Sequence, residues 1–200
     1  MRLIVAALLL QSSPAGQTID RLAAVVGGEP IFLSDVREVV RLRLLDPAGP
    51  LAPVTEPDAS DDALALERLI NRRLVLAEVA RYSQVPPPPA DVDRLETIWA
   101  ARFSERPARD PAFVRAFLAD SLRIDRYIDQ RFTAAAQPTR DEARAFHQAN
   151  PGLFVSNGAP APFEAVEEDA RRRLAEARRL TMVRDWLRGL RERAQVRILR

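Results

Sequence analysis

Two residue types are missing from this 200-residue sequence, and a third occurs once. The absence of cysteine excludes disulfide bonds, thiolate metal ligands and cysteine nucleophiles. Lysine is also absent, so all 30 basic side chains are arginines. Histidine occurs only as His147, and no Asp, Cys or His accompanies it at metal-ligand or general-base spacing. We therefore expect no catalytic residue, no metal and no cofactor.

The sequence also lacks the short motifs of common enzyme classes. There is no G-x-S-x-G, no H-E-x-x-H and no glycine-rich phosphate loop. The pair Gly27-Gly28 does not belong to a G-x-G-x-x-G pattern and indicates a tight turn instead. These absences argue against hydrolases of those types, zinc proteases and nucleotide-binding proteins.

No strong excess of one charge is present. The formal net charge is +2, with 28 acidic side chains against 30 basic ones, although the pI is about 9.8. Arginines at 171–173 and 178–179 suit phosphate groups, but Glu167, Glu168 and Glu176 interleave with them. Pairing along a solvated helix face is the simpler interpretation. A cytoplasmic nucleic-acid binder is therefore the least favoured alternative.

The N-terminus has the layout of a secretory signal peptide. A positive start, Met1-Arg2, precedes the apolar run Leu3 to Leu10, and small residues follow around Ala15. The run is much shorter than the ~20 residues that span a bilayer as a helix. We predict that residues 1–17 are a cleaved signal peptide and that the mature chain is periplasmic. The alternative is an N-terminal strand or helix of the core.

A small hairpin follows this segment. The apolar runs at 22–26 and 31–33 flank Gly27-Gly28, as in a β-hairpin with a two-residue loop. Ser34 is predicted to cap a first helix that ends near Leu45. Because a two-stranded hairpin is marginal alone, we expect the alternating residues Val196 to Leu199 to pair with it.

The remaining chain is predicted to be helical. Apolar residues at helical spacing predict a broad-faced central helix over 61–82, a helix after Pro86 to Pro89, and a long helix from Asp110-Pro111 to Phe132. Thr139 and Glu142 form a capping box for a helix that stops at Asn150-Pro151. A last helix begins at Phe163, with a buried face that continues through Leu174, Ala177 and Leu180 to Ala194. The fold class is mostly α, with a small sheet joining the N-terminal hairpin to the C-terminal strand.

Four segments together resemble one protein family. They are IDRLAAVVGGEPIFLSDV, ERLINRRLVL, PTRDEARAFHQANPGLF and the closing FEAVEEDARRRLAEARR…VRIL. In this order, behind a signal peptide, they resemble the SurA-like periplasmic chaperones, relatives of the parvulin-type foldases. The resemblance implies a helical SurA N-terminal-like domain over residues 18–154, completed by the closing helix and strand at 163–200.

The sequence departs from this family in two respects: the region before Asp110 is shorter than in the larger members, and one domain is missing. Relatives carry a parvulin isomerase domain of roughly a hundred residues, a usual domain size, before the closing helix. Here only residues 155–162 stand at that place, and they are predicted to form a loop. The resemblance therefore implies a chaperone without intrinsic prolyl isomerase activity, and not an enzyme.

A chaperone surface needs exposed apolar and aromatic side chains. Aromatic residues are few, and five of them are the candidate client-binding residues: Trp99, Phe103, Phe113, Phe117 and Tyr127. The competing interpretation of each is a core residue. Trp186 is assigned to packing.

The resemblance predicts ATP-independent binding of unfolded exported proteins, with outer-membrane β-barrel precursors as the expected clients. An active prolyl isomerase and a dedicated assembly partner of one envelope protein are the alternatives. Isomerisation of a proline peptide would favour the first, and a single stoichiometric partner the second.

Overall fold

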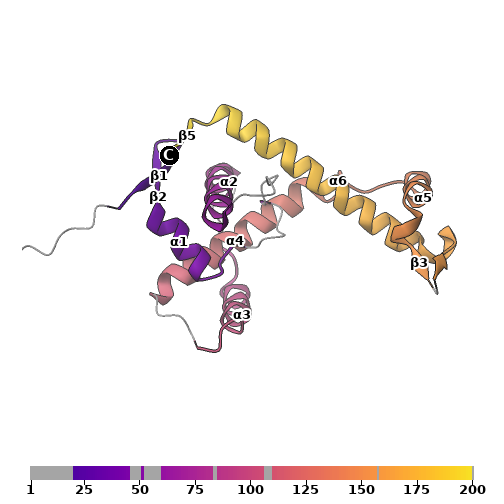
Figure 1. The fold of residues 1–200 in the computed structure, drawn as a ribbon, viewed down its shortest axis with the longest axis horizontal. Coiled ribbons are helices and arrows are strands. Elements are labelled where there is room, and N and C mark those ends of the chain that lie inside the picture. Colours follow the sequence, from indigo (N-terminus) through magenta and orange to yellow (C-terminus); the bar gives the residue numbers. More distant parts are fainter. Residues whose placement is uncertain are drawn as a thin grey trace, which may run out of the picture.

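The computed structural model describes residues 20–45, 51, 60–82, 85–105, 110–156 and 158–199. The predicted signal peptide, residues 1–17, lies outside the described residues. A helical body and a small distant lobe are joined by one long helix (Figure 1). The elements are β1 (Leu22–Val26), β2 (Glu29–Phe32), α1 (Leu33–Arg41), α2 (Asp61–Tyr82), α3 (Pro89–Ala100), α4 (Pro111–Phe132), α5 (Arg140–Ala149), η1 (Pro151–Leu153), β3 (Val155–Ser156), β4 (Ala159–Pro160), α6 (Phe163–Arg193) and β5 (Val196–Ile198).

The two ends of the described chain meet in one antiparallel sheet, with strand order β2-β1-β5. Gly27 and Gly28 form the hairpin turn with φ angles of 58° and 89°, which glycine adopts without steric cost. In β5, Val196 lies opposite Val26 and Ile198 lies opposite Ala24. The mostly α fold with a sheet that joins both ends is thus confirmed.

Helix α1 differs from the prediction at both ends. It begins at Leu33, so Ser34 is not its N-cap but lies in the first turn, where its backbone N–H donates to Asp20 Oδ1 at 3.3 Å. Asp35 accepts the backbone N–H of Phe32 at 3.0 Å. The helix ends at Arg41 and not near Leu45, since the chain turns through Arg43 at φ 48°. The turn buries Leu42, whose carbonyl accepts the indole N–H of Trp99 at 2.7 Å.

Helix α2 is the centre of the body, as its broad apolar face predicted. It contacts α1, α4, α6 and β1, and it buries Ile70, Val75 and Val79 almost completely. A second apolar cluster joins the end of α1 to α3 and α4, around Trp99. In α4, Asp110 accepts the N–H of Ala112 at 2.9 Å and Pro111 opens the helix, as predicted.

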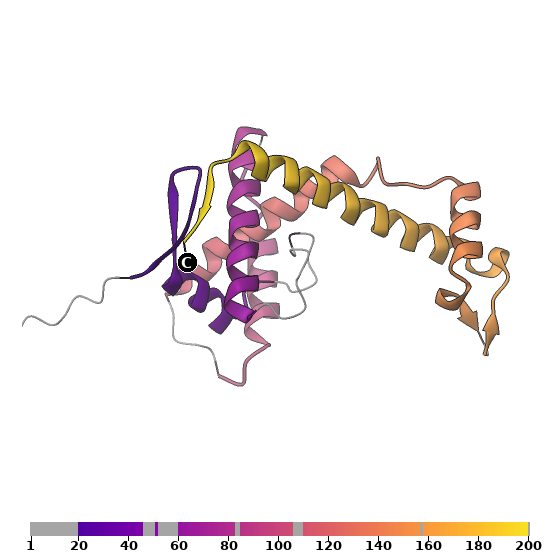
Figure 2. The same cartoon turned by 45° about the horizontal axis from the view of Figure 1, so that its top comes forward.

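Helix α6 connects the two parts of the molecule (Figure 2). At about 1.5 Å per residue, its 31 residues are long enough to belong to both. Val183, Leu187 and Leu190 are buried in the body, whereas Phe163 and Ala170 are buried in the lobe. The predicted continuous buried face is wrong at its middle: Ala177 is exposed, and Leu174 and Leu180 are half-buried, because both apolar clusters end before this section.

The lobe packs α5 against the start of α6. His147 donates from Nε2 to the carbonyl of Ala161 at 2.9 Å, and its ring lies between Phe154 and Phe163. His147 therefore has a packing role here. Residues 155–162 are not a simple loop, because β3 and β4 pair as a short hairpin around Gly158 at φ 80°.

Glu142 gives the lobe a specific acid sensitivity. Hydrogen bonds from Arg178, with Nη2 to Oε1 at 2.7 Å, and then from Thr139 lower the pKa of Glu142 from 4.5 to about 2. Because the folded pKa lies below the ordinary value, this stabilisation is fully present above pH 4.5 and is lost as the pH falls toward 2. We expect hydrogen exchange of the α5 amides to accelerate across this window. Glu142→Gln keeps the cap without a titrating group, so its α5 exchange should lack this acceleration beyond the intrinsic pH effect; identical profiles would contradict the assignment.

Candidate functional site

An open groove runs along one side of α2, between the hairpin and α4. It encloses about 940 Å³ and is called the α2 groove here. Its wall on α2 includes Leu69, Leu76, Ala77 and Ala80, and α4 supplies Phe113, Ala116 and Phe117. The hairpin, α1 and the approach to β5 complete it, through Val26, Gly27, Glu29, Ile31, Asp35, Val39, Ala194 and Gln195.

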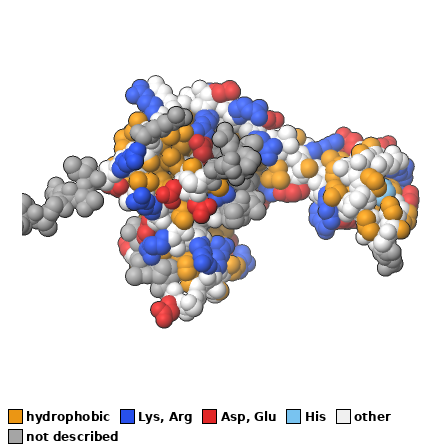
Figure 3. Space-filling view, in the orientation of Figure 1, with side chains coloured by type: hydrophobic (Ala, Val, Ile, Leu, Met, Phe, Trp, Pro, Cys, Tyr) orange, Lys and Arg blue, Asp and Glu red, His pale blue; other side chains and the backbone are white. Residues whose placement is uncertain are grey.

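The lining of the α2 groove is largely apolar. Ile31 and Val39 are buried at its base, while Ala77, Ala80 and Ala116 are exposed along its walls. Hydrophobic side chains gather on this part of the body, beside the hairpin (Figure 3). Small alanines on an exposed helix face leave room for a guest side chain, so the groove is able to accommodate apolar groups of different shapes.

Charged side chains stand among these apolar walls. Arg73 bridges α2 and β2 through Glu29, with Nη1 and Oε2 2.5 Å apart. Arg81 pairs with Glu78 on its own helix at 3.3 Å. Arg193 adds another guanidinium close to the start of β5. Exposed pairs of this kind contribute little to folding, about 0–1 kcal/mol, so their donors are able to exchange partners cheaply.

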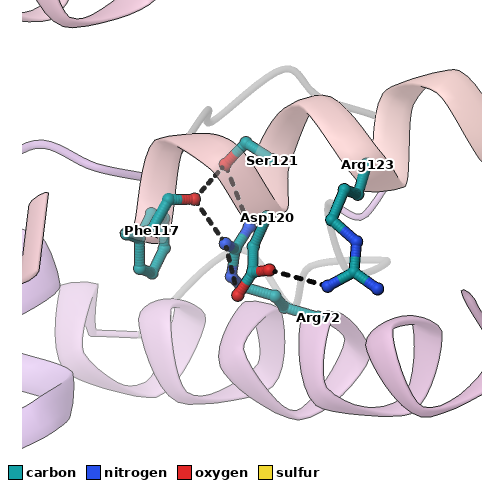
Figure 4. Close-up of polar contacts among 5 residues, drawn as sticks. All are labelled: Arg72, Phe117, Asp120, Ser121 and Arg123. Atoms are coloured by element: carbon teal, nitrogen blue, oxygen red, sulfur yellow. Dashed lines mark hydrogen bonds and ion pairs between the residues drawn. The ribbon is translucent and has the colours of Figure 1, made fainter. Parts of the chain in front are cut away.

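Arg72 fixes the floor of the groove between α2 and α4 (Figure 4). Its Nη2 donates to the carbonyl of Phe117 at 2.6 Å, its Nη1 donates to Ser121 Oγ at 3.0 Å, and Asp120 lies 3.9 Å away. The guanidinium also lies over the Phe117 ring, 3.7 Å from its centre. Burial lowers the pKa of Arg72 to about 10, against the opposing effect of Asp120, and leaves it charged at neutral pH.

Arg72 and Phe117 also border a smaller cavity of about 190 Å³ on the other side of the same contact. Leu95, Trp99 and Leu118 line this cavity from α3 and α4. The stacked pair thus belongs to the lining of both spaces.

Of the five predicted client-binding residues, the structure brings two together in the α2 groove. Phe113 and Phe117 are one turn apart on α4, and both are half-buried. Trp99, in contrast, is only 2% exposed and its indole N–H is bound to Leu42. Trp99 is therefore a core residue, and its burial places it away from the surface where we expected clients.

The other two predicted residues lie elsewhere. Phe103 packs edge-on against Trp99, with ring centres 5.5 Å apart, and Arg43 lies over its ring. Tyr127 lies beside Tyr82 and Trp186, with ring centres 5.9 and 5.7 Å away, in an aromatic row of α2, α4 and α6. Tyr82 is exposed, whereas Tyr127 and Trp186 are half-buried. Neither residue borders the α2 groove.

The residues of α2 that line the groove are not among the predicted site residues. Ala77 and Ala80 carry no chemical signal in the sequence that would mark them as binding residues, unlike aromatic side chains. The apolar face of α2 is nevertheless too wide for one packed stripe, since Leu69, Leu76 and Ala80 lie beside it. That excess width was the available sign of an exposed wall.

The arginines of α6 are mostly engaged with carboxylates. Arg173 pairs with Asp169 at 2.7 Å, Arg178 with Glu142 at 2.7 Å, and Arg179 with Glu176 at 3.0 Å. This supports paired charges on a solvated face over a phosphate-binding stripe.

The described part of the chain shows neither a metal-binding cluster nor a membrane-spanning helix. No group of three or more metal-binding side chains occurs among them. None of the described helices combines the length and apolar character needed to cross a membrane.

Comparison with known proteins gives a match in structure but not in sequence. No family model and no curated protein matches the sequence. A solved structure from the work on PEB4 and Cj1289 matches over 90% of this chain and 100% of the other, with TM-score 0.57 and 13% identity. PEB4, a virulence factor, and Cj1289, a periplasmic protein, are described as two structurally related SurA-like chaperones of Campylobacter jejuni.

The chain has a SurA-like fold. The fold expected from the four sequence segments is therefore confirmed, although so few identical residues remain that no residue role transfers from the other structure. In this SurA-like fold, the hairpin and the closing strand form one sheet at one end of the body. The α2 groove begins at that sheet, where Val26, Glu29 and Ile31 line it.

Proposed function

We propose that this chain is a chaperone that holds unfolded polypeptides in the α2 groove. The observation that carries the proposal is the open, largely apolar groove itself, with Phe113 and Phe117 on one wall and alanines on the other. An open groove of this size admits several apolar side chains of an extended chain. The SurA-like fold supports the proposal independently, because the matched structure belongs to chaperones.

Binding would rest on modest contacts. Each square ångström of apolar surface removed from water stabilises a complex by roughly 25 cal/mol, before the cost of ordering an unfolded chain is subtracted. The arginines around the groove add donors for client carbonyl and carboxylate groups. Adaptable walls with few fixed polar contacts favour many clients over one. Release would then need no nucleotide, and the sequence has no phosphate-binding loop to supply one.

The proposed clients are exported proteins, above all precursors of outer-membrane β-barrels. The signal-peptide layout of residues 1–17 supports a periplasmic location for the mature chain. One protein of the matched structural work is itself described as periplasmic. Unfolded barrel strands alternate apolar and polar side chains, so they offer repeated apolar groups at short spacing to an open groove.

We further propose that the chain lacks prolyl isomerase activity. Residues 155–162 are too few to hold a domain of about 100 residues at the place where relatives carry one. The chain should therefore leave the cis–trans relaxation of a proline peptide at its spontaneous rate of tens to hundreds of seconds.

Light scattering tests the holding function. A denatured β-barrel membrane protein is diluted into buffer without ATP, with and without residues 18–200. We expect suppression of aggregation at near-stoichiometric ratios, and we expect it to survive moderate salt because the main contacts are apolar. Scattering that is unchanged by the chain would contradict the proposal and favour a dedicated assembly partner of one envelope protein.

A further inference from the structure

The two edges of the three-stranded sheet differ in their main-chain groups. β2 forms one edge, and its groups are occupied or missing. Pro30 has no N–H, its carbonyl accepts Arg73 Nη2 at 3.4 Å, and the N–H of Phe32 is bound to Asp35. Proline and covering side chains are devices that keep further strands away from a sheet edge. The β2 edge is closed to strand addition.

The β5 edge is open by comparison. The carbonyl of Gln195 accepts the N–H of Gly27 at 3.1 Å, and the N–H of Leu199 donates to Ala23 at 2.9 Å. Since main-chain groups alternate between the two sides of a strand, Val196 and Ile198 direct theirs away from β1. No other described strand pairs there. Ile198 and Leu199 are also 45% and 44% exposed, so apolar side chains accompany this open edge.

We propose that an extended client segment adds to β5 as a fourth antiparallel or parallel strand. This deepens the proposed function and rests on it, because the segment belongs to the same unfolded clients. Gln195 and Ala194 border the α2 groove and lead directly into β5. A client chain that pairs with β5 therefore lies next to the groove that takes its side chains, and main-chain bonds supply affinity without sequence requirements.

The charge of β5 selects this occupant over a second copy of the chain. In an antiparallel two-fold pair, the register that uses the groups of both Val196 and Ile198 places Arg197 opposite the partner copy's Arg197. Like charges directly opposite each other are destabilising, and they come closest in such non-hydrogen-bonded pairs. A segment with an acidic residue opposite Arg197 has no such repulsion. The preferred ligand is thus an extended segment that alternates apolar and polar residues around an aspartate or glutamate.

Peptide binding to residues 18–200 tests the proposal. The probe is an eight-residue peptide of alternating threonine and valine with one central aspartate. Its twin carries N-methyl groups on the central amides, which removes strand-forming donors and keeps every side chain. Amide hydrogen exchange at Val196 and Ile198, followed by NMR, is the readout. We expect saturating probe to slow both amides by about tenfold, equivalent to 1.4 kcal/mol, and the twin to have no effect.

Charge reversal checks the choice of ligand. An arginine in place of the peptide's central aspartate should weaken binding to the native chain, and Arg197→Glu should reverse that preference. Ile198→Pro removes one outward N–H and should weaken probe binding, while aggregation suppression by the groove persists in part. Binding of probe and twin with equal affinity, or unprotected amides, would overturn strand addition even if aggregation suppression stands.

Two outcomes separate this inference from related possibilities. Protection of Val196 and Ile198 that rises with protein concentration in the absence of peptide would show self-pairing and overturn the client assignment. Ala77→Trp should lose aggregation suppression and keep probe binding, because Ala77 lines the groove and the probe pairs with β5.

Discussion

Replacing Ala77 by tryptophan is expected to abolish most of the aggregation suppression. Ala77 is exposed on the α2 wall of the groove, opposite Phe113 and Phe117 of α4. An indole at this position fills the space that a client side chain would use. Loss of one well-buried aromatic or aliphatic anchor costs a complex about 2 kcal/mol, so the affinity for a denatured client should fall at least about tenfold. Light scattering and client titration measure the change.

Ala63→Trp is the matched control for this variant. Ala63 is also exposed on α2, but it does not border the groove. Both variants place a tryptophan on an exposed helix position, so their helix propensities and thermal stabilities should remain close to those of the native chain. Equal aggregation suppression by the two variants would show that clients do not use the α2 groove.

Replacing Arg72 by alanine is expected to destabilise the body by about 2–4 kcal/mol. The substitution removes the hydrogen bonds to Phe117 and Ser121 and the stacking on the Phe117 ring. It also leaves Asp120 without one of its two arginines, although Arg123 stays 3.2 Å away. Urea unfolding followed by circular dichroism measures the loss of unfolding free energy.

Arg73→Ala is the comparison, because Arg73 is the next residue and its bridge to Glu29 is solvent-exposed. An exposed pair contributes about 0–1 kcal/mol, so this variant should unfold near the native midpoint. If both variants lost the same unfolding free energy, the buried network between α2 and α4 would not be the main contact that we describe.

Much of the fold was predictable because strong local signals agreed with it. Gly27-Gly28 fixes the hairpin turn, and Asp110-Pro111 and the Thr139–Glu142 pair fix two helix starts. Each of these signals acts locally: the glycines allow positive φ angles, and the capping side chains accept main-chain N–H groups at the helix starts. Pairing of β5 with β1 followed from the marginal stability of a lone hairpin. The order of these elements also agreed with a known family.

Features set by tertiary contacts were harder to predict. Helix α1 stops early because Leu42 and Leu44 turn into the second apolar cluster, and no local signal marks that turn. The middle of α6 is exposed because two separate apolar clusters share one helix. Helical spacing in a sequence shows which residues share a face, but not whether a partner covers that face along its full length.

The candidate site was predicted only in part. Phe113 and Phe117 were selected for their aromatic character, and they do line the groove. The same criterion selected Trp99, which the core buries completely around a hydrogen bond to Leu42. Composition does not separate an aromatic anchor on a surface from one in a core, whereas the excess width of the α2 face carried independent information.

Site-specific photocrosslinking is the most direct test of the central claim, that unfolded clients occupy the α2 groove. A photoreactive phenylalanine analogue would replace Ala80 in the groove or the exposed Gln148 of α5 in the lobe, each in residues 18–200. A denatured β-barrel precursor is added without ATP and the sample is irradiated. We predict a strong crosslink from position 80 that unlabelled precursor competes away, and little from position 148. A crosslink from position 148 with none from position 80 would contradict the account.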